Sequence, residues 1–191
     1  MPHHDHQHGN QPIEGRHSRN YDRLARLLMK PLYRRIAADI AAVAPEGAAL
    51  LDVGTGPGIL LQTLARTRPD LRLTGVDLAP DMVDLARRNL GGLAELHAAD
   101  AAALPFDDAR FDLVVTSFSS HHWGDPQAGA TEIARVLTPG GRLLNYDFPR
   151  APLSAFTNGT GLTLTGQSRF RAGLAGLHMK VVRLEAAKRP R

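Results

Sequence analysis

The stretch LLDVGTGPGILLQTLA, residues 50–65, joins a short apolar run to a helix-like pattern through a turn rich in glycine. Gly54, Gly56 and Gly58 occupy alternate positions, and the acidic residue Asp52 precedes the first of them by two positions. Glycine adopts backbone angles that other residues avoid and lets a ligand come close to the main chain. The first turn of a helix offers unpaired N–H groups to that ligand. The stretch therefore predicts a strand, a ligand-binding turn and a helix.

Two classes of ligand are held by such a turn: dinucleotides and S-adenosylmethionine. The dinucleotide pattern is G-x-G-x-x-G, and here Ile59 stands where that pattern has its third glycine. A carboxylate at Asp52 would repel a pyrophosphate, but it suits the ammonium group of S-adenosylmethionine. Both observations favour S-adenosylmethionine, and a dinucleotide-dependent oxidoreductase stays open as an alternative.

Strand-like and helix-like patterns alternate after this turn, which predicts a doubly wound α/β fold with a mostly parallel sheet and helices on both faces. The expected strands are 48–53, 71–76, 93–98, 111–117 and 142–147. The expected helices are 58–66, 80–90 and 126–137, the last one closed by Pro139-Gly140-Gly141. A short link then joins strand-like segments 161–170 and 177–187, which permits only an antiparallel hairpin.

The residues before this core divide into two parts. Residues 1–18 hold five of the nine histidines and no apolar anchor, so we expect a disordered leader, although such a tract could bind a transition metal. Helical spacing follows, and Pro31 is expected to break it into helices 20–29 and 32–43. We therefore expect one domain over 19–191, with a helical part at 20–44, a cofactor-binding core at 48–147 and a hairpin at 161–187.

Composition excludes several classes of function. The chain has no cysteine, which rules out disulfides, thiolate metal sites and cysteine nucleophiles and favours a cytoplasmic location. No apolar run approaches the roughly 20 residues of a membrane span. Residues 16–35 include seven basic residues and one acidic residue, and residues 180–191 include five basic residues and one acidic residue. These segments could attract an anionic substrate or a nucleic acid. A solvated surface is the preferred interpretation, because no stacking aromatics are interleaved with the charges.

Two further acids end the next two strands. Asp77 follows Gly58 by 19 residues, where an acid can accept hydrogen bonds from both ribose hydroxyls of either cofactor class. Asp100 ends the third strand, where a carboxylate could accept from an adenine amino group. Ligands of open α/β sheets bind at the carboxyl edge of the strands, so Asp52, Asp77 and Asp100 are expected to line one site.

The segments LLDVGTGPG, TGVDLAPDMVDLARRN, HAADAAALPFDDARFDLVVTSFSSHHW and EIARVLTPGGRLL carry a family resemblance. In this order and spacing they resemble the class I S-adenosylmethionine-dependent methyltransferases, and more narrowly the branch that includes quinone-biosynthesis and other small-molecule enzymes with a methyltransferase type 11 domain. The resemblance covers about residues 48–147. It implies a Rossmann-like seven-stranded sheet whose last strand is antiparallel, and transfer of a methyl group to a small molecule.

The resemblance also implies roles for particular residues. Asp52 and the glycine turn would hold the methionine part of the cofactor, Asp77 its ribose, and Asp100 with the Ala101 backbone its adenine. Leu78 and Met82 would pack against the adenosine, and Ser117 would lie near the methionyl amino group. The implied cofactor-binding set is therefore Asp52, Gly54, Gly56, Gly58, Asp77, Leu78, Met82, Asp100, Ala101 and Ser117.

Three residues are candidates for the chemistry. His121 and His122 follow the fourth strand, near the expected methyl group, and histidine is the commonest base for removing a proton from an acceptor. In relatives, however, a string of this kind often shapes the loop instead. Tyr21 opens the helical part, which lies over the cofactor as a lid in many relatives. Tyr146 and Asp147 end the fifth strand and could contact the substrate or be satisfied by nearby backbone.

The chain departs from its relatives after the fifth strand. Only about a dozen residues, 149–161, separate that strand from the hairpin, so there is little room for a substrate-binding cap. The substrate is then small, or the site is open, or a second subunit of a homodimer completes it. An asparagine-proline-proline-aromatic string is absent, which makes nucleic-acid amino groups an improbable target. A non-catalytic S-adenosylmethionine-binding protein or partner subunit is the alternative function.

Overall fold

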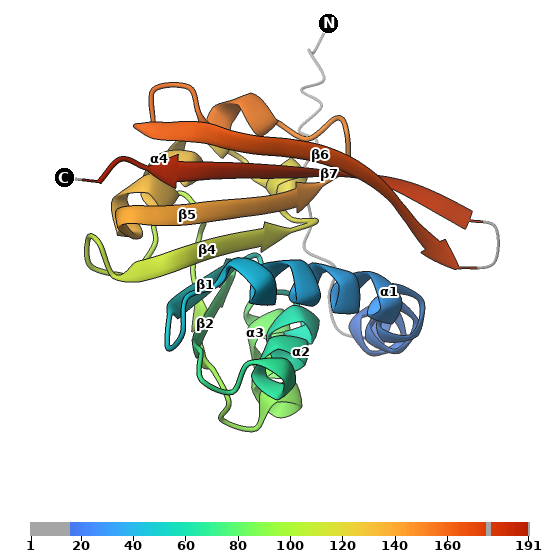
Figure 1. Cartoon of the computed structure of the whole chain (residues 1–191). Helices are drawn as coiled ribbons and strands as arrows, with labels where there is room; N and C mark the ends of the chain where they lie inside the picture. The colour runs from blue at the N-terminus through green and yellow to red at the C-terminus, as the bar shows by residue number, and fades with distance from the viewer. Residues whose placement is uncertain (1–15, 175–176, 191) are drawn as a thin grey trace, which may run out of the picture.

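The computed structural model describes residues 16–174 and 177–190, with side chains from 29 to 172 and from 179 to 190. They form a seven-stranded sheet in the order β3-β2-β1-β4-β5-β7-β6 (Figure 1). Strands β1 to β5 are parallel to one another, whereas β7 runs antiparallel to β5 and to β6. The strands are β1 (Ala49–Val53), β2 (Arg72–Asp77), β3 (Glu95–Ala98), β4 (Phe111–Ser117), β5 (Leu137–Asp147), β6 (Leu162–Leu174) and β7 (Leu177–Lys188). The predicted fold class is confirmed.

Helices cover both faces of the sheet. On one face, α1 (Arg16–Val43), α2 (Ile59–Thr67) and α3 (Pro80–Leu90) pack with the strands around one apolar cluster. On the other face, α4 (Pro126–Val136) and the short helix η2 (Leu153–Phe156) close a second cluster. The alternating side chains of each strand divide between the clusters, so that Leu50 of β1 lies in the first and Leu51 in the second. None of the described helices is long and apolar enough to cross a membrane.

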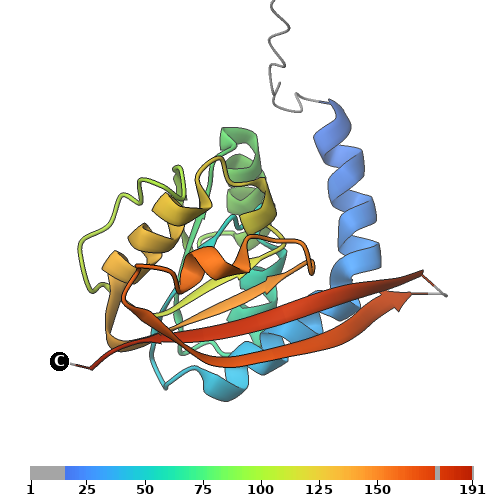
Figure 2. The ribbon, with the colours of Figure 1, turned by 90° about the horizontal axis from the view of Figure 1, so that it is seen from above.

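Helix α1 corrects the prediction that Pro31 separates two helices. The helix runs from Arg16 to Val43 with Pro31 inside it, so it also begins within the segment 1–18 that was expected to be disordered. Figure 2 shows that its two arms run in different directions. Proline removes one hydrogen bond and bends a helix. The second arm nevertheless stays helical because it buries Leu32, Ile36 and Ile40 against the sheet.

Two other boundaries differ from the sequence prediction. Helix α4 ends at Val136 and strand β5 begins at once at Leu137, so Pro139-Gly140-Gly141 lies within the strand. The register between β4 and β5 shifts between Phe111 and Leu113, which accommodates this turn-like sequence as an irregularity. The hairpin strands are also longer than the predicted 161–170 and 177–187.

The order of the strands marks where a ligand can bind. From β1 the chain proceeds through β2 to β3 on one side, and it then crosses to β4 on the other side of β1. Such a reversal leaves an opening between the loops that follow the two central strands, at their carboxyl ends. The glycine turn follows β1 and the segment 118–123 follows β4, so both lie at this switch point.

Candidate active site

The glycine turn is fixed to the sheet by its own backbone. The N–H groups of Gly54 and Thr55 both donate to the carbonyl oxygen of Val76, each over 2.9 Å. Gly54, Gly56 and Gly58 all have positive φ, between +52° and +76°. Residues with a Cβ rarely adopt this conformation, which explains why glycine stands at all three positions.

The three glycines differ in what surrounds them. A Cβ at Gly54 would lie 2.3 Å from the Cβ of Ser119, and one at Gly58 would lie 2.9 Å from Cδ1 of Leu90. At Gly56, by contrast, a Cβ would meet no atom within 4 Å. The turn is therefore packed tightly against the loop after β4 and against α3, while its middle is open to a ligand.

Gly54 is expected to tolerate no side chain. Gly54→Ala should lower the melting temperature far more than Gly140→Ala, which has the same positive φ (+79°) but no neighbouring atom within 4 Å. Both variants carry the cost of the left-handed conformation, about 1–2 kcal/mol. Only Gly54→Ala also forces Ser119 away, for a further ~1–3 kcal/mol. Thermal unfolding checks this, and equal losses for the two variants would contradict the close packing.

Asp77 organises the turn at its open side. Its Oδ2 accepts a hydrogen bond from Gly56 N (2.7 Å), and its Oδ1 accepts one from Ala79 N (3.0 Å). Burial raises the pKa of this carboxyl, although the two backbone donors counteract the rise. The next residue, Leu78, is 71% exposed and offers an apolar side chain beside the turn. Met82 is half-buried one turn into α3.

Asp52 lies beneath the turn. Its side chain is fully buried, and Oδ2 accepts a hydrogen bond from the Thr55 hydroxyl (2.9 Å), whereas Oδ1 has no hydrogen-bond partner. Burial raises the pKa of Asp52 to about 7. Burial of a carboxyl with one unsatisfied oxygen lowers the stability of the fold. Such a group therefore indicates a functional site. The expected direct contact of Asp52 with a ligand stays a prediction, because no surface of that oxygen is exposed.

The raised pKa predicts how Asp52→Asn behaves. The unfolded chain loses this proton near pH 3.8 and the folded protein near 7, so the charge of Asp52 lowers the free energy of unfolding as pH rises through that interval. Asp52→Asn should therefore melt higher than the parent protein, by more at pH 8 than at pH 5. The same variant should weaken binding of S-adenosylmethionine at pH 8. Calorimetry at both pH values checks this, with the exposed Asp107→Asn as control, and a pH-independent gain would contradict it.

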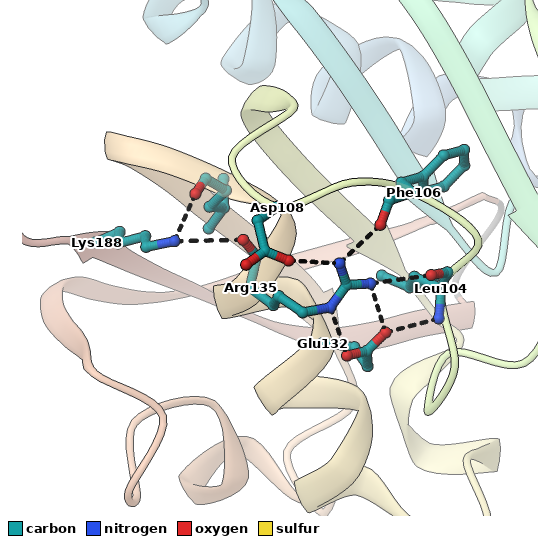
Figure 3. A network of polar contacts seen from close by, with 7 residues as sticks. Leu104, Phe106, Asp108, Glu132, Arg135 and Lys188 are labelled. Atoms are coloured by element: carbon teal, nitrogen blue, oxygen red, sulfur yellow. Dashed lines mark hydrogen bonds and ion pairs between the residues drawn. The ribbon is translucent and has the colours of Figure 1, made fainter.

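The third acid lies on the loop that joins β3 to β4. Asp100 is exposed, and its Oδ1 accepts a hydrogen bond from Ala102 N, while Ala101 is buried. Farther along this loop, the guanidinium of Arg135 on α4 donates to the carbonyl oxygens of Leu104 and Phe106 (Figure 3). Hydrogen bonds from Arg135 lower the pKa of Glu132, which in turn accepts from Leu104 N. This network holds the loop that carries Asp100 against α4.

The loop after β4 brings His121 to a carboxylate that sequence reasoning did not pair with it. Nδ1 of His121 lies 2.7 Å from Oδ1 of Asp147, at the end of β5. Asp147 is fully buried and also accepts from the Ser120 hydroxyl, His121 N and Phe148 N. A carboxylate surrounded by donors accepts the Nδ1 proton of the imidazole, so that Nε2 becomes the free acceptor. The sequence signal that could have suggested this pairing is the position of Asp147 at the end of the fifth strand, which lies at the same edge of the sheet as His121.

The two adjacent histidines are thereby distinguished. The His122 ring is exposed and stacks on His121 with centroids 3.9 Å apart, but it has no carboxylate partner among the described residues. The ring of Phe148 packs against His121 (5.0 Å) and against Phe118 (5.3 Å). Phe118 has φ +53°, a strained conformation for an aromatic residue, and strain of this kind gathers at functional sites. Trp123 packs on Phe156 and Gly129.

Three other residues that the sequence singled out lie in different parts of the structure. Ser117 ends β4 and is buried. Tyr146 is buried on the face that α1 covers and donates to Asp39 Oδ2 (2.5 Å), so of the two possibilities left open by the sequence it is satisfied within the protein, by a side chain instead of the backbone. Arg183 donates to the same oxygen (2.6 Å), and together they fix the second arm of α1 to the sheet. Tyr21 belongs to α1, but its side chain lies outside the described residues.

Comparison with known proteins decides the family. Residues 51–145, the part that contains β1 to β5 and the acids described above, match the family model described as a methyltransferase domain. These residues form a methyltransferase domain of this family.

Relatives and solved structures agree with this assignment. Demethylmenaquinone methyltransferase of Thermus thermophilus is 40% identical over 143 residues, which are 71% of this chain and 64% of the relative. The chain thus spans somewhat less than two thirds of that methyltransferase. A crystal structure of an S-adenosylmethionine-dependent methyltransferase from Aquifex aeolicus superposes with a TM-score of 0.72 at 18% identity, over 92% of this chain and 99% of the other.

The fold by itself does not fix the reaction. The crystal structure of the [4+2]-cyclase SpnF is also similar, with a TM-score of 0.71 at 20% identity over 83% of this chain and 81% of the cyclase. The reaction of this protein therefore has to be inferred from its own side chains. The family and fold imply use of S-adenosylmethionine, and they give no support to the non-catalytic alternative.

Proposed function

We propose that the protein transfers a methyl group from the sulfonium sulfur of S-adenosylmethionine to a small planar acceptor of the quinol type, which is activated by loss of the proton from a ring hydroxyl. The observation that carries this proposal is the pairing of His121 with the buried Asp147. The loop that bears His121 is held against the cofactor turn, because Ser119 packs on Gly54 and its hydroxyl donates to Val53 O (2.8 Å). A candidate base and a candidate cofactor site are thus adjacent.

The residues at the turn fit S-adenosylmethionine. Asp77 presents a carboxylate beside the open position at Gly56, Leu78 offers an exposed apolar surface, and Asp52 keeps an unsatisfied buried oxygen. These features suit a ligand with ribose hydroxyls, an apolar base and an ammonium group better than a diphosphate. When bound, this cofactor supplies an activated methyl group on a sulfonium centre. We assign Asp77 to the ribose, Leu78 and Met82 to the adenosine, Asp100 and Ala101 to the adenine, and Ser117 to the region of the methionyl group.

The other residues act on the acceptor. Asp147 fixes the His121 ring with Nδ1–H donating to it, which leaves Nε2 free to take a proton from an acceptor hydroxyl. Loss of that proton places negative charge on the acceptor and makes it a better nucleophile. The rings of Phe118 and Phe148 form a partly exposed aromatic surface next to His121, against which a flat ring can stack. The main task of the chain is then to position the reactants and exclude water.

The acceptor class rests on this aromatic surface and on the relatives. The Thermus thermophilus relative is named a demethylmenaquinone methyltransferase, and a Geotalea daltonii relative, 34% identical over 137 residues, is named a ubiquinone/menaquinone biosynthesis C-methyltransferase. The short segment between β5 and β6 supports a small or openly bound substrate. A cytoplasmic location, a homodimer and a lid role for residues 20–44 stay predictions.

The test is turnover. The full chain is incubated with S-adenosylmethionine and a panel of quinols, phenols, amines and carboxylic acids, and formation of S-adenosylhomocysteine is measured. We expect product with ring hydroxyl acceptors, and no product when that hydroxyl is blocked as an ether. Binding of S-adenosylmethionine without turnover on any acceptor would instead favour the non-catalytic alternative.

A further inference from the structure

Strands β6 and β7 continue beyond the edge at which the candidate site lies. Asp147 is the last residue of β5 and pairs with Val182 of β7, so the part of the hairpin between Arg169 and Val181 has no neighbour in β5. Figure 1 shows this two-stranded ribbon extending well past the ends of β4 and β5. On the side of α1, Phe170, Ala172 and Met179 of this ribbon pack against the core, so the opposite side is the one available for contact with another surface.

One face of the projecting ribbon carries three cations. Arg171 pairs with Lys180 across the hairpin, and Arg169 lies two positions before Arg171, so all three side chains point to the same side. All three are exposed, and none forms a hydrogen bond or ion pair with another of the described residues. We call Arg169, Arg171 and Lys180 the basic face.

The basic face is on the same side of the sheet as the candidate base. Val182 pairs with both Asp147 and Arg169, so these three side chains share one face. The opposite face belongs to α1, because Arg183 there bonds to Asp39 of that helix. Each step between neighbouring strands is about 4.8 Å, which places the backbone of Arg169 within about 10 Å of that of Asp147.

The sequence around the basic face has a distinctive composition. No aspartate or glutamate occurs between Asp147 and Glu185, so nothing in this segment neutralises its cations. Arg150, three residues past Asp147, is exposed as well. The described part of the ribbon thus carries cations that no acid of the segment 148–184 neutralises.

We propose that the basic face binds the surface of an anionic lipid bilayer. Lysine and arginine near such a surface are attracted to its acidic headgroups. A nucleic acid is less suited, because the only described aromatic residue of the ribbon, Phe170, lies on the opposite face under Arg35. Docked in this way, the protein turns the His121 side of its sheet toward the bilayer, where an apolar acceptor would be dissolved.

The experiment measures binding of the full chain to vesicles by co-sedimentation. Vesicles of phosphatidylcholine with phosphatidylglycerol are compared with vesicles of phosphatidylcholine alone. We expect binding only to the former, weakened by added salt because screening reduces the attraction. Each basic residue contributes about fivefold to the partition coefficient, so Arg169→Gln/Arg171→Gln should bind about 25-fold more weakly.

The control is Arg66→Gln/Arg88→Gln, which makes the same change of charge at exposed arginines on α2 and α3 and should bind like the parent protein. Neither pair has a partner whose loss would unfold the chain, and circular dichroism verifies this. Equal binding to neutral vesicles, equal weakening by the control pair, or tighter binding to a soluble oligonucleotide or an acidic protein would each overturn the proposal. The assay needs no turnover, so it is independent of the proposed reaction.

Discussion

Asp147→Asn is expected to lower kcat for methyl transfer by about 100-fold or more, while the affinity for S-adenosylmethionine stays the same. The carboxylate accepts four hydrogen bonds, among them the one from Nδ1 of His121. An asparagine amide has one acceptor and one donor end, so it cannot accept all four. The imidazole then loses its fixed orientation and tautomer, and Nε2 is no longer held ready to take a proton.

Neighbouring variants separate this role from a structural one. His121→Gln should reproduce the loss in kcat, whereas His122→Gln should cause a much smaller loss, because His122 has no carboxylate partner among the described residues. An acceptor whose hydroxyl is already ionised at the assay pH should restore most of the rate of Asp147→Asn. If that acceptor is turned over no faster, or if binding of S-adenosylmethionine falls in parallel with kcat, then Asp147 only supports the fold.

Asp77→Ala is expected to weaken binding of S-adenosylmethionine by about 100-fold or more. Two hydrogen bonds from ribose hydroxyls to a carboxylate contribute about 3 kcal/mol together, which corresponds to about 150-fold in affinity. The substitution also releases Gly56 N and Ala79 N, the two backbone donors that shape the turn. Isothermal titration of the variant measures the loss.

Two controls make the result specific. Asp107→Ala removes an exposed acid from a loop away from the turn and should bind as the parent protein does. Asp77→Asn keeps one acceptor oxygen and should give an intermediate affinity. A melting temperature for each variant shows whether the fold is retained. A folded Asp77→Ala protein with undiminished affinity would show that the ribose is held elsewhere.

The sheet was predictable because its signals are local. The central strands β1, β4 and β5 contain short apolar runs, and α3 is bounded as expected by Pro80 and by Gly91 in the left-handed conformation. The continuity of helix α1 through Pro31 was not predictable in this way. It depends on apolar contacts with residues that are distant in the sequence, and local helix propensity does not include such contacts.

The sequence predicted which residues belong to the candidate site better than it predicted which of them contact one another. The acids at Asp52, Asp77 and Asp100 end consecutive strands, so topology alone places them at one edge. The pairing of His121 with Asp147, 26 residues later, depends on the register of β5 beside β4 and on the strained turn at Phe118. The different surroundings of Tyr146 and Asp147 follow from strand alternation, because Tyr146 faces α1 and Asp147 faces the loop after β4.

The most direct test of the account is calorimetric titration of the parent protein with S-adenosylmethionine and with NADH under the same conditions. The carboxylates at the glycine turn predict saturable, one-site binding of S-adenosylmethionine and no detectable binding of NADH. Binding of NADH with none of S-adenosylmethionine would contradict the assignment of the site.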